Sequence, residues 1–141
     1  MAEAKKISEE FSFGGQPTPE DLKHLADEGF KSVINLRFSD ETGVLVDEQQ
    51  QAEAVGLQYL NLPLSSSSAD AELTAKTIAE IEQLPRPVYF HCGSGGRASA
   101  AALIAFATQQ KLNQAAVLAK ATEMGINPEQ PQLKQFLDSI S

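Results

Sequence analysis

The sequence predicts an α/β domain with a central, mostly parallel sheet of four to five strands flanked by helices. Strand-like apolar runs alternate with helical patterns along the chain, which is typical of this fold class. The length of 141 residues corresponds to one domain, and we expect a single domain over residues 1–141. With 42% hydrophobic and 21% charged residues, the composition excludes a fibrous or disordered chain.

The helices are marked by capping residues and by apolar periodicity. Thr18 and Pro19 are typical of an N-cap and a first helical position, and Asp21 is an acid three residues after the cap. This helix is expected to end at Glu28, because Gly29 can adopt the left-handed conformation without strain. Helical patterns are also expected over residues 46–55, 70–84, 97–111, 113–123 and 129–140.

Apolar runs between these helices predict the strands. Phe30–Leu36 follows the first helix, Leu57–Leu62 follows the second, and Val88–His91 is a short run typical of a buried strand. Pro85 and Pro87 separate the last run from the preceding helix, because proline disfavours helical geometry in the residue before it.

Charge and hydropathy exclude several kinds of partner. The net charge of −8 and the pI of about 4.7 offer no basic surface to nucleic acid or to an anionic membrane. The longest apolar stretch, Ala100–Ala107, is shorter than the roughly 20 residues of a membrane span. Met1–Glu10 contains three glutamates and no apolar run, so no secretory signal is expected.

The single cysteine, Cys92, excludes internal disulfides and zinc sites built from several cysteines. His24, His91 and Cys92 lack the spacing of a metal site, and we expect neither a metal nor another cofactor. A lone thiol fits a reducing compartment, so the expected location is the cytoplasm.

The segment His91–Arg97 carries the strongest functional signal. It lies between the last predicted strand and an alanine-rich helix, where open α/β sheets bind their ligands. Its glycines allow successive backbone N–H groups to turn inward around an anion, and the helix N-terminus adds its positive dipole. Thiolates are favoured in such places, so Cys92 is a candidate nucleophile beside the guanidinium of Arg97. The alternative is a cysteine that serves only as a small core residue.

The distribution of charge along the chain agrees with a functional role for this segment. No acidic residue occurs between Glu82 and Glu123, although the chain contains 19 of them. The same stretch contains several basic residues: Arg86, Arg97, Lys111 and Lys120. Carboxylates are therefore absent from the sequence around the thiol.

The cysteine segment resembles the signature of cysteine-dependent phosphatases, including the dual-specificity group, in which His-Cys precedes a phosphate loop that ends in arginine. Upstream, Gly15-Gln16-Pro17, Gly29–Arg37 and Glu41 are similar to a small bacterial branch of that fold, the beta-lactamase-hydrolase-like, phosphatase-like family. The resemblance extends over about Phe11–Met124 and implies a cysteine phosphatase-like fold.

The resemblance also implies roles for individual residues. Cys92 is expected to attack phosphorus, Arg97 to bind the phosphate oxygens, and His91 to orient the loop. The loop residues expected to hold the anion are Gly93, Ser94, Gly95 and Gly96. The implied substrate is a small-molecule or protein phosphate ester.

Two features depart from the phosphatase signature. Four residues separate Cys92 from Arg97 where the signature has five, and four is the spacing of rhodanese-type sulfurtransferases, whose loop holds a persulfide. A persulfide sulfur is smaller than a phosphoryl group with its equatorial oxygens, so a tighter loop suits it. A sulfane sulfur donor is therefore an alternative substrate. Ala98 stands where phosphatases place a serine or threonine that bonds the thiolate, and Ser99 is a candidate for that contact.

Phosphatases of this kind typically take a general acid from a loop upstream of the cysteine. Here the segment after Leu64 reads Ser65–Ser68, and Asp70 is the nearest acid before the next helix. Asp70 is the candidate general acid, and the alternative is a helix N-cap. Without an acid, an activated leaving group or sulfur transfer is favoured, since acid catalysis contributes typically ~10²–10⁴-fold.

Three upstream residues are expected near the site. Arg37 and Glu41 are predicted to form an ion pair that shapes a loop near the site, and Arg37 is also a candidate for contact with the substrate. Gln16 is a candidate pocket residue, and the simpler alternative is a polar turn residue.

One alternative belongs to another functional class. Gly93–Ala98 matches the G-x-G-x-x-A pattern of dinucleotide-binding loops. That pattern needs a carboxylate about 20 residues further on, at the end of the next strand, and no such strand is predicted here. A non-catalytic anion- or dinucleotide-binding module thus remains the more remote alternative.

Overall fold

The computed structural model describes residues 4–93 and 95–141. Within these residues the strands are β1 (Lys5–Lys6), β2 (Phe11–Gly14), β3 (Ser32–Asn35), β4 (Gln58–Asn61) and β5 (Val88–His91). The helices are α1 (Pro19–Asp27), α2 (Glu48–Ala54), α3 (Ala71–Glu82), α4 (Gly96–Gln110), α5 (Gln114–Met124) and α6 (Pro131–Ser139).

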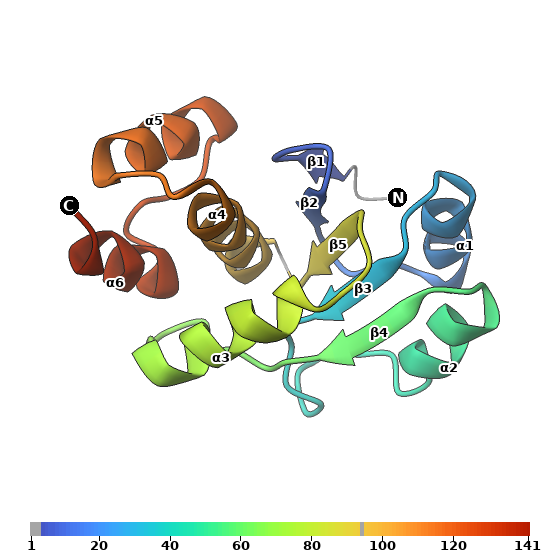
Figure 1. Ribbon diagram of the computed structural model, residues 1–141. Coiled ribbons are helices and arrows are strands. Elements are labelled where there is room, and N and C mark those ends of the chain that lie inside the picture. Colours follow the sequence, from blue (N-terminus) through green and yellow to red (C-terminus); the bar gives the residue numbers. More distant parts are fainter. Residues whose placement is uncertain (1–3, 94) are drawn as a thin grey trace.

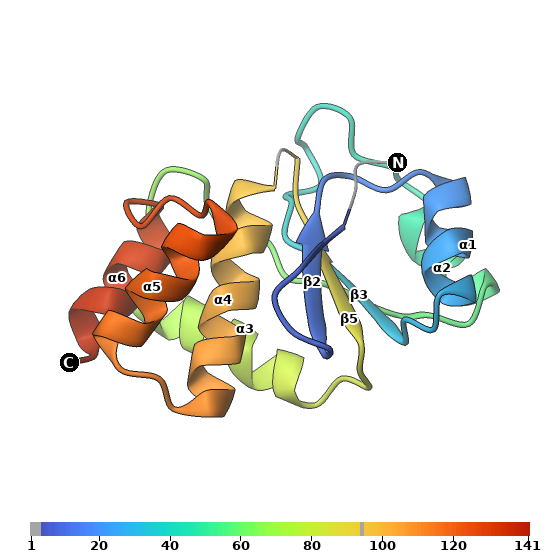
Figure 2. The ribbon, with the colours of Figure 1, turned by 90° about the horizontal axis from the view of Figure 1, so that it is seen from above.

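The sheet lies between two layers of helices. Its strand order is β1-β2-β5-β3-β4, and each neighbouring pair is parallel except β1 with β2. Helices α1 and α2 cover one face, whereas α3, α4, α5 and α6 lie on the other side (Figure 1, Figure 2). The expected α/β class with a mostly parallel sheet is confirmed.

Local capping explains where the first helix begins and ends. The Thr18 hydroxyl accepts a hydrogen bond from the Asp21 amide at 3.1 Å, and the Asp21 carboxylate accepts one from the Thr18 amide at 2.9 Å. These reciprocal bonds satisfy N–H groups that the helix itself leaves without partners. At the other end, Gly29 follows the C-cap with φ of 98°, a conformation that favours glycine.

Strands β1 and β2 were not predicted from the sequence, which marked only three strands. The run Phe11–Gly14 has only four residues, Phe-Ser-Phe-Gly, which is too short for its alternation to stand out as a strand pattern. Its hydrogen bonds come from a parallel ladder with β5, in which Phe11 pairs with Val88 and Gly14 with His91. A partner more than seventy residues away leaves no local trace in the sequence.

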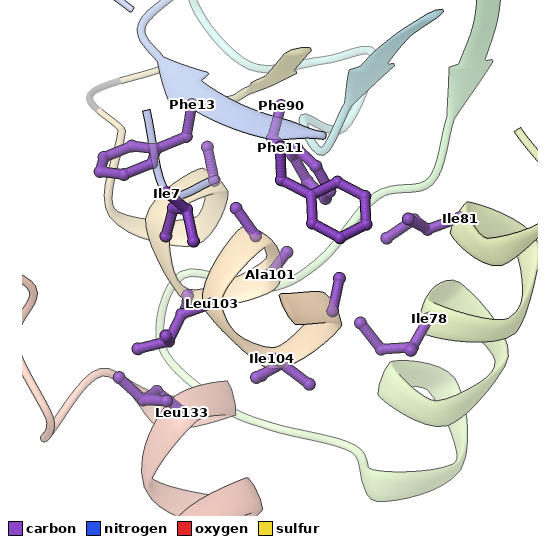
Figure 3. Packing of buried hydrophobic residues seen from close by; sticks show 14 of the residues in the cluster. Ile7, Phe11, Phe13, Ile78, Ile81, Phe90, Ala101, Leu103, Ile104 and Leu133 are labelled. Carbon is purple, nitrogen blue, oxygen red and sulfur yellow. The ribbon is translucent and has the colours of Figure 1, made fainter. Parts of the chain in front are cut away.

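The larger part of the core lies between the sheet and helices α3, α4 and α6 (Figure 3). Phe11 and Phe90 meet there edge to face, with ring centroids 5.7 Å apart. Helix α4 is apolar around most of its circumference because it packs against the sheet and other helices at once. A smaller cluster, which includes Leu22, Val33 and Tyr89, fills the opposite face beneath α1 and α2.

The parallel register brings the ends of four strands to one edge of the sheet. Gly14 and Asn35 both pair with His91, and Asn61 pairs with Asn35, so the segments that follow these residues start side by side. The cysteine segment leaves the sheet at this edge, as expected for a ligand site. None of the helices in the described part of the chain combines the length and the apolar character that a membrane span requires.

Replacing Phe11 by alanine is expected to lower the free energy of unfolding by about 3–5 kcal/mol, because it empties a fully packed site against Phe90. Urea denaturation measures this loss. Phe38→Ala is the matched control, since Phe38 is 43% exposed and its loss should change stability by less than about 0.5 kcal/mol. Equal losses in the two variants would contradict the assignment of Phe11 to the core.

Candidate functional site

Cys92 lies at the end of β5, beneath the loop that leads into α4. Its side chain is only 1% exposed, and the backbone amides of Gly95 and Ala98 donate to Sγ at 3.1 and 3.4 Å. Gly95 reaches this position with φ of 100°, which an L side chain rarely adopts. The sulfur therefore sits against two N–H dipoles, near the N-terminus of α4, in addition to its apolar neighbours.

Arg97 lies in the first turn of α4, and hydrogen bonds to other segments fix its guanidinium in place. Its Nη1 donates to the carbonyl oxygens of Leu36 at 3.2 Å and Leu64 at 2.9 Å. Nη1 and Nη2 also donate to the two carboxylate oxygens of Glu41, at 2.8 and 2.7 Å. A guanidinium has five N–H groups, and among the described contacts Nε–H and one Nη2–H have no carbonyl or carboxylate partner, while the Cys92 thiol nearby also contributes to the raised pKa of Arg97. These contacts therefore fix the orientation of the side chain before any ligand arrives.

Glu41 is the carboxylate on which this arrangement depends. Its hydrogen bonds to Arg97 lower its pKa from the ordinary 4.5 to about 2, against the opposing effect of burial, with smaller contributions from the Phe38 amide and Arg37. The same carboxylate raises the pKa of Arg97. Glu41 is thus ionised at neutral pH, and a carboxylate so strongly held in the anionic form is a poor proton donor.

Arg37 connects Glu41 to the next part of the site. The predicted ion pair is confirmed, with Arg37 Nε 3.3 Å from a Glu41 oxygen, and Arg37 Nη2 also donates to the Thr42 carbonyl. Its Nη1 donates to the Gln16 side-chain oxygen at 2.8 Å. The Arg37 guanidinium lies 3.8 Å from where a Cβ on Gly93 would be, so it packs against the cysteine loop.

Glu48 completes the chain of polar contacts and was not predicted from the sequence. It lies in α2 and is 1% exposed, with one carboxylate oxygen 2.5 Å from Gln16 Nε2 and the other 2.6 Å from His91 Nε2. His91 is fully buried beside the cysteine, and within the described residues its Nδ1 has no hydrogen-bond partner. Contacts therefore run without a break from His91 through Glu48, Gln16, Arg37 and Glu41 to Arg97.

Other predicted site residues are placed as follows. Asp70 is the N-cap of α3, and its Oδ1 accepts from the amides of Glu72 at 3.0 Å and Leu73 at 3.2 Å. Its predicted alternative role as a helix cap is therefore confirmed. The Ser99 hydroxyl donates to the Gly96 carbonyl at 2.9 Å, rather than to the sulfur. Ser94 lies outside the described residues.

A cavity of about 470 Å³ opens above the loop and is lined by Ser66, Gly93, Gly96, Arg97 and Gln130. Ser66 belongs to the serine segment in which an acid was sought, and that segment is held by Gln132, whose Nε2 donates to the Ser65 carbonyl at 2.8 Å. No carboxylate lines this cavity among the described residues. Gln130, the N-cap of α6, was missed because nothing in the sequence relates it to the cysteine loop.

A family model and several known proteins match this chain in sequence. The family described as DSP-PTPase phosphatase fused to NAD⁺ kinase matches residues 2–138. The beta-lactamase hydrolase-like protein of Agrobacterium fabrum is 36% identical over 101 residues, which are 67% of this chain and 23% of that protein. The chain thus spans less than a quarter of the length of this relative.

Solved structures share the fold. A DUF442 protein from Shewanella putrefaciens superimposes with a TM-score of 0.79 at 22% identity, over 96% of this chain and 89% of that one. Tk-PTP in its active form gives a TM-score of 0.73 at 20% identity, over 96% and 91% of the two chains. Both likenesses bear on the fold, which is that of the cysteine phosphatases.

The lowered pKa of Glu41 predicts how its contribution to stability depends on pH. Because the pKa is lower in the folded protein than in the unfolded chain, the stabilisation is present above pH 4.5 and is lost as the pH falls towards 2. The melting temperature of Glu41→Gln should therefore lie below that of the parent protein at pH 6, and the difference should shrink across this range.

Glu80→Gln is the matched control, because Glu80 is exposed on α3 and lines neither cavity among the described residues. Its melting temperature should follow that of the parent protein at every pH. A difference between Glu41→Gln and the parent that stayed constant down to pH 2 would contradict the role given to the Glu41 carboxylate.

Proposed function

This chain belongs to the family described as "DSP-PTPase phosphatase fused to NAD⁺ kinase", and we propose that it hydrolyses phosphate esters with Cys92 as the nucleophile. The observation that carries the proposal is the placement of the Cys92 sulfur. The backbone amides of Gly95 and Ala98 donate to it, and the oriented guanidinium of Arg97 comes from the first turn of α4, between these two residues. Such an arrangement suits an anionic sulfur beside an anionic substrate.

In the proposed reaction the Cys92 thiolate attacks phosphorus, and the bond from phosphorus to the leaving oxygen breaks. Loop amides and the remaining N–H groups of Arg97 bind the phosphoryl oxygens, whose charge they stabilise. A water molecule then attacks the phosphocysteine, the S–P bond breaks, and inorganic phosphate leaves while the thiolate is restored. His91 and Glu48 hold the strand end from which the loop starts.

The leaving oxygen needs a proton, or must be stable without one. Three carboxylates that could serve as the acid have other partners among the described residues, because Glu41 is bound to Arg97, Glu48 to His91 and Asp70 to the α3 amides. A phenolate leaves readily as an anion, whereas an alkoxide does not. We therefore propose substrates with an acidic leaving group, since a general acid otherwise contributes typically ~10²–10⁴-fold.

A sulfurtransferase is the second candidate, and the four-residue interval from Cys92 to Arg97 favours it. In that reaction the thiolate takes a sulfane sulfur from a donor such as thiosulfate, which leaves as sulfite. Cyanide then attacks the persulfide and leaves as thiocyanate, which restores the thiolate. The absence of a carboxylate from the described cavity lining is compatible with this chemistry, because no leaving alkoxide requires protonation.

Purified protein should hydrolyse p-nitrophenyl phosphate, and Cys92→Ser should lower kcat below detection without unfolding the chain, as measured by its melting temperature. Thiosulfate with cyanide is assayed in parallel. Turnover of thiosulfate without turnover of the aryl phosphate would favour the sulfurtransferase and contradict the phosphatase. Full activity of Cys92→Ser would exclude both covalent mechanisms.

Access to the sulfur can be measured independently, because Cys92 is the single cysteine and alkylation reports on it alone. Iodoacetate should react with the native protein, and inorganic phosphate should protect against it by occupying the loop. Iodoacetate carries the negative charge that the site should attract, and neutral iodoacetamide is the matched reagent. A thiol that reacts only after denaturation would contradict the nucleophile assignment.

Asp70→Asn and Asp70→Ala separate a helix cap from a general acid. Asparagine caps as well as aspartate but cannot donate a proton, so Asp70→Asn should retain both stability and kcat. Asp70→Ala should lose about 1 kcal/mol of unfolding free energy, measured by urea denaturation, because two α3 amides lose their partner. A large fall in kcat for Asp70→Asn at unchanged stability would instead identify Asp70 as the acid.

A further inference from the structure

A second cavity, of about 400 Å³, adjoins the cavity above the cysteine loop. Gly96 and Gln130 line both, so the two cavities share part of their walls. Gly95 and Ser99 also line the second cavity, which places it directly beside the sulfur-binding loop. Its volume lies within the roughly 300–1,000 Å³ of pockets that hold small ligands.

The sheet positions Lys5 at this second cavity. Lys5 in β1 pairs with Phe13 in β2, and both residues line the cavity. The next residue of β2, Gly14, has its carbonyl oxygen 3.9 Å from where a Cβ on Gly95 would be. The strand pairing therefore connects the lysine to the cysteine loop through one continuous wall.

The charges that line the two cavities are of one sign. The described residues that line them include two charged side chains, Lys5 and Arg97, and no aspartate or glutamate. The chain as a whole contains 19 acidic and 11 basic residues, yet none of the acidic ones is among the described residues that line either cavity. Cavity walls of one sign raise the local concentration of ligands of the opposite sign.

We propose that the second cavity is a subsite for a second anionic group of the substrate. The preferred substrates would then be phosphate esters that carry a further phosphate or carboxylate, bound with the reacting phosphate at the loop and the other anion towards Lys5. A compact spacer would cross Gly96 between the two cavities, with Phe13, Met124 and Ile126 available to its apolar parts. This inference rests on the proposed phosphatase activity for its substrate class.

The test compares 1,4-phenylene bisphosphate with phenyl phosphate, which share the aromatic ring and the leaving oxygen. After correction for its two equivalent phosphates, the bisphosphate should have the higher kcat/KM, chiefly through a lower KM. Lys5→Ala should reduce this preference by about 1.5- to fivefold, the range of an exposed ion pair, and Lys5→Glu should reduce it further. Added salt should weaken the preference in the parent protein, because exposed charges are screened.

Lys6→Ala is the matched control. Lys6 is the neighbouring residue of β1 and lines neither cavity, and its Nζ is 2.9 Å from a carboxylate oxygen of Glu9. This variant should therefore keep the full preference for the bisphosphate. A preference that is unchanged in Lys5→Ala, or that is absent from the parent protein, would overturn the subsite.

Failure of the proposed phosphatase can be distinguished from failure of the subsite. If neither phosphate is hydrolysed, the binding of 1,4-phenylene bisphosphate to Cys92→Ser protein is measured by calorimetry, with and without Lys5→Ala. Weaker binding by the double variant would support the subsite although the activity had failed. Equal binding by both proteins, or no binding by either, would overturn it.

Discussion

The ion pair between Arg97 and Glu41 is the interaction on which the rest of the site depends. Arg97 is 9% exposed, and a charge at such depth is tolerated only with a partner. Removing Glu41 would leave the buried guanidinium of Arg97 without its counter-charge, whereas Glu41 itself is 25% exposed and partly solvated. The pair also fixes the orientation of the Arg97 guanidinium. The carboxylate occupies one side of it, and the N–H groups on the other side can face a ligand. Stability and ligand geometry thus come from the same contact.

The same contact joins segments that are far apart in the chain. Glu41 follows β3, Arg97 begins α4, and Arg37 links the pair to Gln16, which follows β2. Glu48 then connects Gln16 to the end of β5, so one network spans the edge of the sheet where the strands end. The hydrogen bonds within such a network polarise one another, and a buried polar group that loses its partner destabilises the fold. A change in any member is therefore expected to reach the cysteine loop.

Structural features whose determinants are local in the chain could be predicted from the sequence. The predicted bounds of β5, the capping box at Thr18 and the pairing of Arg37 with Glu41 all depend on residues within a few positions of one another. Features that depend on distant partners could not be predicted. Examples are β2 and the contact of Glu48 with His91, which lies 43 positions further along the chain. Burial of Glu48 could not be inferred either, since an isolated glutamate in a helix is normally exposed. The cavities arise from several separate segments and leave no pattern in any one of them.

Charge at the site is subtler than the sequence indicates. The charged residues near the thiol in the sequence are all basic. The structure, however, pairs Glu41 with Arg97 and Glu48 with His91. Because Glu41 neutralises much of the charge of Arg97, attraction of an anion depends more on the loop amides and the N-terminus of α4. These dipoles act only at short range, and the net charge of −8 repels anions at longer range. A cation that lines the cavities without a carboxylate beside it, as Lys5 does among the described residues, therefore has more influence on ligand choice than its exposed position suggests.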